Sequence, residues 1–95
     1  MDKNQIIEKL KSIKPLLQEK YGVTELALFG SYSRDEQTEK SDIDILVSHD
    51  KKMGMQFLDL VYDLDKLFNK EVQVVSKKGI KPKYLQAIQQ DLIYV

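Results

Sequence analysis

The chain has 95 residues and a mass of 11.1 kDa, which suits a single domain. Fifteen Lys and Arg balance fifteen Asp and Glu, so the overall charge does not favour a nucleic-acid-binding protein. The absence of cysteine excludes disulfides and thiolate metal sites. No signal-peptide pattern opens the sequence, and no apolar run reaches the ~18 residues needed to span a bilayer. We therefore expect a cytoplasmic protein without membrane contact.

The N-terminal part of the chain predicts a helix. Apolar residues recur at helical spacing over residues 6–17. Asp2 followed by Gln5 is typical of a helix N-cap, and Gly22 is typical of the residue that ends a helix. Pro15 predicts a break or kink at the residue before it, with the proline opening a second helical piece.

The middle of the chain predicts two strands and two helices. The apolar run 25–29 lies between two glycines and indicates a buried strand. Residues 31–37 predict about two turns of helix, and the β-branched, alternating run 42–47 predicts a second strand. Residues 57–68 carry the clearest helical stripe of apolar residues in the chain. We interpret the acidic residues of this helix as solubilising; they are Asp59, Asp63 and Asp65.

The C-terminal part predicts a strand over residues 72–75, a helix that begins at Pro82, and a short terminal strand over residues 92–95. This order of elements indicates an α/β or α+β layer in which helices cover a sheet. A group of lysines follows the third strand. We interpret it as a solvated loop and helix start rather than a site for a triphosphate, an RNA or an acidic partner; its members are Lys77, Lys78, Lys81 and Lys83.

Two carboxylates occupy the predicted second strand. Asp42 and Asp44 are two residues apart, so their side chains project from the same face, ~6.5–7 Å apart along the strand. Neighbouring carboxylates repel unless a cation lies between them, and Mg²⁺ prefers one or two carboxylates together with substrate phosphates. An Asp-x-Asp pair at a strand end is also compatible with a solvated edge. The pair alone leaves both interpretations open.

Gly30-Ser31 stands where a strand ends and a helix is expected to begin. A helix N-terminus offers free N–H groups to an anion, glycine lets a phosphate approach the backbone, and the serine hydroxyl adds a donor. The dipeptide equally fits a simple turn in which Ser31 is the N-cap. Joined to the acidic pair ten residues later, it predicts a site for a nucleoside triphosphate and its Mg²⁺.

Residues 28–34 (Leu-Phe-Gly-Ser-Tyr-Ser-Arg) and 41–47 (Ser-Asp-Ile-Asp-Ile-Leu-Val) resemble the minimal nucleotidyltransferase family of the DNA polymerase β-like superfamily. That family's signature is Gly-Ser, ten residues, then Asp-x-Asp. The resemblance covers nearly the whole chain and implies one minimal nucleotidyltransferase domain over residues 1–95. The implied fold is α+β, with a small mixed β-sheet flanked by helices. The implied reaction transfers a nucleoside monophosphate, usually from ATP, with Mg²⁺ present as two ions and pyrophosphate as the leaving group.

The resemblance also implies roles for individual residues. Gly30 and Ser31 would bind the β- and γ-phosphates, while Asp42 and Asp44 would hold Mg²⁺ and act in catalysis. Arg34 falls at the position of an arginine that often follows the Gly-Ser pair. A phosphate contact and a structural ion pair are both open for this arginine.

Two positions depart from the family pattern. The family often has glycine where this chain has Asp35, and we expect the effect to stay within that loop. The family's third acidic residue lies on the next strand, where this chain has Gln73. Glutamine cannot accept a proton and is a poor Mg²⁺ ligand, and a lost general base is worth ~10²–10⁴-fold in rate. Glu71, two residues earlier on the same strand face, is the candidate to replace the missing acid.

Members of this family are commonly encoded beside a small helical HEPN-domain protein as a toxin–antitoxin pair, in which the nucleotidyltransferase adenylylates the HEPN ribonuclease. The resemblance therefore implies an antitoxin that moves AMP from Mg-ATP to a HEPN-type toxin. Because Gln73 replaces an acid, the alternative is a catalytically weakened module that binds nucleotide and partner and neutralises the toxin by contact. A small-molecule transferase has less support, since the sequence shows no acceptor pocket. Self-association is left open.

Overall fold

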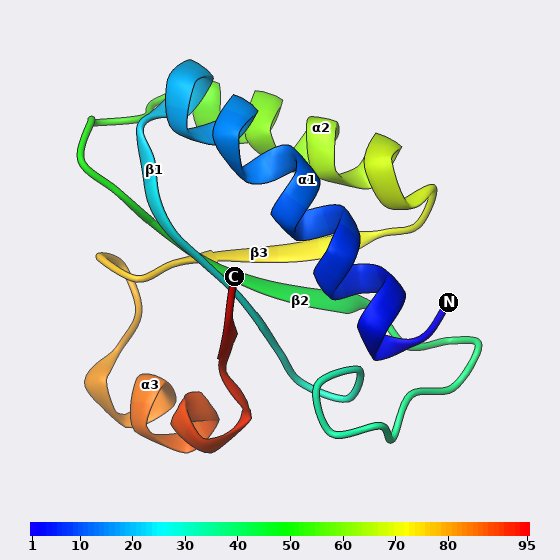
Figure 1. Ribbon diagram of the computed structural model, residues 1–95. Coiled ribbons are helices and arrows are strands. Elements are labelled where there is room, and N and C mark those ends of the chain that lie inside the picture. The colour runs from blue at the N-terminus through cyan, green and yellow to red at the C-terminus, as the bar shows by residue number, and fades with distance from the viewer.

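The computed structural model describes residues 1–95. It contains a four-stranded sheet and three α-helices (Figure 1). None of the helices is both long and apolar enough to cross a membrane. In chain order the elements are α1 (Lys3–Tyr21), β1 (Val23–Phe29), β2 (Ile43–His49), α2 (Gln56–Phe68), β3 (Val72–Ser76), α3 (Pro82–Ile88), the 3₁₀ helix η1 (Gln89–Asp91) and β4 (Ile93–Tyr94).

The sheet is mixed, with strand order β3-β2-β1-β4. β1 pairs antiparallel with both β2 and β4, whereas β2 and β3 run parallel. A parallel pair needs a crossover connection, and α2 provides it. The predicted α+β class with a small mixed sheet is confirmed.

The two faces of the sheet are covered to different extents. Figure 1 shows α1 and α2 together on one side and α3 on the other. The strand residues under α1 and α2 belong to the larger apolar cluster, whereas α3 contributes Ile88 to a cluster of only four buried residues. Side chains alternate along β2, so Ile43 and Ile45 point into the larger cluster and Asp44 lies on the less covered face.

α1 runs without interruption through Pro15, so the predicted break before this residue is wrong. A proline inside a helix costs about 3 kcal/mol or more. Leu10 and Leu17 on either side of it are fully buried, and each contributes about 1.5–3 kcal/mol, which favours one continuous helix. The predicted N-cap is confirmed, because Asp2 and Gln5 form a reciprocal capping box.

Residues 31–35 form turns instead of the predicted two turns of helix. One helical turn begins, since the N–H of Arg34 donates to the carbonyl of Gly30 at 3.2 Å and that of Glu36 to Ser31 at 2.9 Å. Asp35 then adopts a φ of 57°, and a left-handed residue cannot propagate a right-handed helix. A glycine at this position would adopt the same conformation without steric cost.

The acidic residues of α2 do more than solubilise the helix. Asp63 accepts hydrogen bonds from the hydroxyl of Tyr21 at 2.6 Å and from Nζ of Lys20 at 3.0 Å, and the Tyr21 contact is the main cause of its lowered pKa. Asp65 accepts the N–H of Val72 at 2.8 Å. The interpretation of these two residues as solubilising is therefore wrong: they join α2 to α1 and to the start of β3.

Candidate nucleotide site

Gly30 and Asp44 lie against each other where β1 ends and β2 begins. The antiparallel register pairs Phe29 with Asp44, which brings the glycine and the carboxylate together. A Cβ built on Gly30 would lie 2.1 Å from Oδ2 of Asp44, and the φ of Gly30 is +80°. Position 30 therefore has neither the space nor the backbone conformation for a side chain, and the Asp44 carboxylate lies directly beside bare backbone.

The turn after Gly30 presents free backbone donors. Its own hydrogen bonds use the N–H groups of Arg34, Asp35 and Glu36, so those of Ser31, Tyr32 and Ser33 donate to no group of the protein. Tyr32 is buried in the larger apolar cluster and anchors the turn, while Ser31 is half-buried. Free N–H groups at the start of a helical turn are suited to a phosphate.

Asp42 and Asp44 are close enough to repel each other. Burial raises the pKa of the Asp44 carboxyl, the charge of Asp42 raises that pKa further, and the Arg34 guanidinium lowers it. A divalent cation between the carboxylates would remove this repulsion, and two carboxylates with substrate phosphates suit Mg²⁺. The residues present therefore fit a magnesium ion held by Asp42 and Asp44, where it would neutralise phosphate charge.

Arg34 makes structural ion pairs, one of the two alternatives that the sequence left open. Its Nε lies 2.7 Å from Oε1 of Glu36 and its Nη1 lies 2.6 Å from Oδ2 of Asp91. The hydrogen bond to Glu36 is the main cause of the raised pKa of the guanidinium, and the hydrogen bond to Asp91 is the second. The backbone carbonyl of Asp91 also accepts a hydrogen bond from the hydroxyl of Ser33. Asp91, 57 residues further along the chain, thus holds the Gly30 turn, and no local sequence signal indicated it.

Gln73 lies directly beside Asp44, because the parallel register of β2 and β3 pairs these two residues. Its Nε2 lies 3.5 Å from Oδ2 of Asp42 and 3.3 Å from Oε1 of Glu71. The four side chains thus share one edge of the sheet. No group of three or more acidic or histidine side chains is arranged to hold a metal, and the replacement of the third acid by Glu71 stays a prediction.

Residues 10–95 of the chain match the nucleotidyltransferase domain family. The protein belongs to the nucleotidyltransferase family. It is 34% identical over 94 residues to the protein adenylyltransferase MntA of Thermococcus cleftensis, covering 94% of this chain and 95% of that one. It is 43% identical over 96 residues to a Methanocaldococcus jannaschii protein provisionally named protein adenylyltransferase MJ1379, covering 97% of this chain and 96% of that one.

Solved structures share the fold of this nucleotidyltransferase. One, described provisionally as a minimal nucleotidyltransferase, has a TM-score of 0.83 at 26% identity and covers 98% of this chain and 95% of its own. A toxin–antitoxin structure solved with AMP-PNP has a TM-score of 0.73 at 23% identity and covers 99% of this chain and 72% of its own. The expected family and fold are therefore confirmed.

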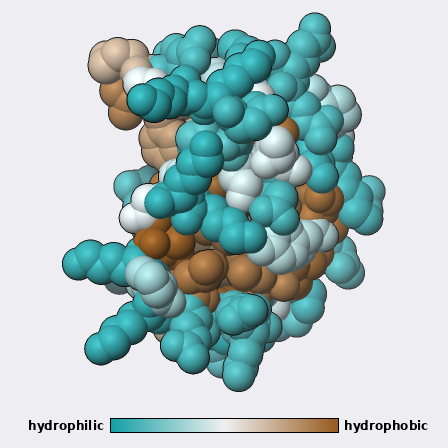
Figure 2. All heavy atoms as spheres, turned by 90° about the vertical axis from the view of Figure 1, so that its left-hand side faces the viewer, coloured by the Kyte–Doolittle hydropathy of each residue, from teal (hydrophilic) through white to brown (hydrophobic).

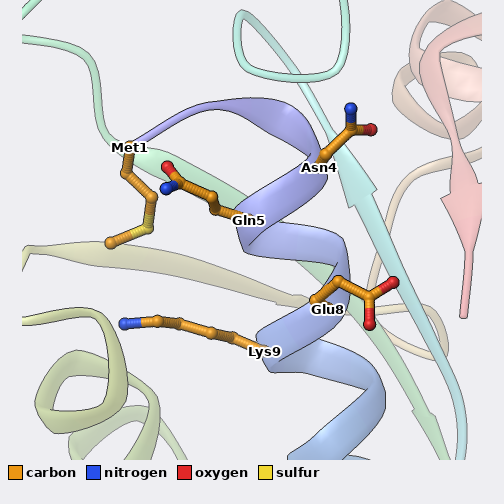
Figure 3. A pocket seen from close by; sticks show the side chains of 5 residues that line it. All are labelled: Met1, Asn4, Gln5, Glu8 and Lys9. Carbon is orange, nitrogen blue, oxygen red and sulfur yellow. The ribbon is translucent and has the colours of Figure 1, made fainter.

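The larger of two surface hollows, about 600 Å³, lies on the first turns of α1 and not at the Gly30 turn. Figure 3 shows the side chains of Asn4 and Glu8 on one side of the helix and those of Met1, Gln5 and Lys9 on the other. None of the predicted nucleotide-binding residues lines this hollow. Its size alone therefore does not mark the site.

The second hollow, about 300 Å³, lies between α3, η1, β4 and the residue after β3, and none of the predicted nucleotide-binding residues lines it. Figure 2 shows apolar atoms at the surface across the lower half of the side that carries the β3–α3 connection. Lys77 lines the hollow and pairs with Glu25 at 3.1 Å, so it is tied to β1 rather than being part of a freely solvated loop. Lys78, Lys81 and Lys83 are exposed and form no ion pair, as predicted.

Proposed function

We propose that this nucleotidyltransferase transfers AMP from Mg-ATP to a protein partner, a small helical HEPN-domain protein, and acts as the antitoxin of that pair. One observation carries the proposal: the Gly30 turn, with its free N–H groups, meets the Asp42–Asp44 pair at one edge of the sheet. Relatives named protein adenylyltransferase support the reaction. A tri-AMPylated HEPN toxin in complex with an MNT antitoxin, which shares the fold, supports the kind of partner.

Each residue has a defined task in this proposal. The backbone of Gly30 and the N–H and hydroxyl of Ser31 bind the β- and γ-phosphates. Asp42 and Asp44 hold Mg²⁺, which supplies charge neutralisation at the phosphates when bound. Arg34 positions the phosphate-binding turn through its ion pair with Asp91. The oxygen of the acceptor hydroxyl then bonds to the α-phosphorus while its proton is released to solvent, and the bond from that phosphorus to the oxygen of the leaving pyrophosphate breaks.

Nucleotide binding tests the site without any partner. Isothermal titration calorimetry would measure the affinity of the full chain for AMP-PNP with and without Mg²⁺. The variant Asp42→Asn with Asp44→Asn should lose metal-dependent binding beyond the ~10–100-fold that an outer-shell change costs. Asp59→Asn, an exposed acid on α2, is the matched control and should bind as the wild type does. Unchanged binding by the double variant would refute the assigned site.

A second candidate function follows from Gln73, which stands where the family has its third acid. In that case the protein binds nucleotide and neutralises the partner by contact without transfer. Label transfer from α-phosphate-labelled ATP to the HEPN partner separates the two. Label with the wild type supports the enzyme, whereas label only with Gln73→Asp supports the binding module.

A further inference from the structure

We infer that Gln73 limits this site to one divalent cation, held by Asp42 and Asp44 together with the nucleotide. The inference rests on the proposed function and concerns how many ions the site accepts. The family resemblance implies two ions. The side chain at position 73 does not fit the second one.

Position 73 is the place from which a third ligand would reach the aspartates. Gln73 and Asp44 are register partners on neighbouring parallel strands, which lie about 4.8 Å apart. Side chains of such partners project from the same face of the sheet, so a carboxylate at position 73 would stand beside that of Asp44. The carboxamide that stands there is neutral, and hard cations such as Mg²⁺ prefer anionic oxygen ligands.

The amide group of Gln73 is turned toward carboxylates, as a donor. Nε2 lies 3.5 Å from Oδ2 of Asp42 and 3.3 Å from Oε1 of Glu71, so its N–H groups are directed at these two acids. Gln73 thus connects these carboxylates by hydrogen bonds where the family has a further negative charge. The exposed Glu71 is held on the far side of the amide, and it does not join the aspartates in a three-acid cluster.

The charge of the protein side chains that would hold the metal agrees with a single ion. Asp42 and Asp44 together supply two negative charges, which balance one divalent cation. The nucleotide phosphates add negative charge that two ions would share, but a second cation would find no protein carboxylate beyond the two that already hold the first, because position 73 is a neutral amide. Repulsion between the ions would then oppose its binding. Gln73 therefore sets the ion count through the charge that it lacks.

Counting ions tests the inference directly. Free Mn²⁺ would be followed by electron paramagnetic resonance while the full chain, saturated with AMP-PNP, is titrated with the metal. We expect one Mn²⁺ per nucleotide-bound chain for the wild type and two for Gln73→Asp. Gln73→Asn is the matched control, because it has the size of the aspartate variant without its charge, and it should stay at one. Gln73→Glu gives a second charged variant should Gln73→Asp fold poorly.

The possible results separate this inference from the proposed function. Two ions in the wild type, or one ion in both charged variants, would overturn the inference and leave the nucleotide site intact. The absence of any nucleotide-dependent ion in the wild type would instead contradict the site itself. One ion in the wild type and two in a charged variant would support both.

Discussion

Replacing Gly30 with alanine should destabilise the protein by an amount that two separate effects determine. The left-handed φ of +80° costs an L-residue about 1–2 kcal/mol. The new Cβ would also lie 2.1 Å from Oδ2 of Asp44, and moving that side chain off its rotamer costs about 0.5–1.5 kcal/mol. The expected loss is about 1.5–3.5 kcal/mol in the free energy of unfolding. For a domain of this size a loss of about 2.5 kcal/mol lowers Tm by roughly 10–20 °C.

Urea denaturation of Gly30→Ala in two backgrounds separates the effects. In the Asp44→Ala background the closest contacts of the new Cβ are absent, so Gly30→Ala should cost about 0.5–1.5 kcal/mol less there than in the wild type. Gly54→Ala is the matched control, since a Cβ at position 54 meets nothing within 4 Å, and its effect should stay within about 0.5 kcal/mol. Equal costs in both backgrounds would refute the contact between Gly30 and Asp44, and a loss below about 0.5 kcal/mol would refute the strain as well.

Three further changes test the fold and the charge of the site. Tyr21→Phe removes the 2.6 Å hydrogen bond to Asp63 and should lower the free energy of unfolding by about 1.5–3 kcal/mol, so an unchanged urea midpoint would contradict this contact. Asp44→Asn should stabilise the metal-free protein at neutral pH, because folding raises the pKa of this carboxyl. That gain should vanish in thermal melts as the pH falls below the ordinary value of 3.8, and a less stable variant at neutral pH would argue against it. Leu64→Ala should cost about 2–5 kcal/mol and the exposed Leu58→Ala under about 0.5 by chemical denaturation; similar losses would contradict the assigned core.

Local patterns predicted most of the secondary structure because they report how each segment is buried. The alternation of residues 42–47 corresponds to β2, and the apolar stripe of residues 57–68 corresponds to α2. The predicted strand over residues 72–75 and the helix beginning at Pro82 are also confirmed. In each case the spacing of the apolar residues matches the geometry of the element, so the residues of that segment alone are enough to predict it.

The two errors in secondary structure arose where distant contacts or a single dihedral angle decided the outcome. Pro15 is tolerated because the residues around it are buried against the sheet, which a local rule for proline does not include. The helix expected over residues 31–37 stops because Asp35 is left-handed. Aspartate is among the non-glycine residues that adopt this conformation most often, but it also occurs in helices, so its identity alone did not predict the end of the helical turn.

The sequence alone predicts the chemistry of the site, because the residue types and the ten-residue spacing between Ser31 and Asp42 are typical of a site for a nucleotide and a divalent cation. What the sequence could not determine is which groups meet. The strand register places Asp44 beside Gly30 on one side and beside Gln73 on the other. Asp91, at the end of η1, reaches Arg34 only in the folded chain, because 57 residues separate the two. Register and packing are properties of the whole folded chain, because each strand is positioned by the apolar residues that it buries together with its neighbours.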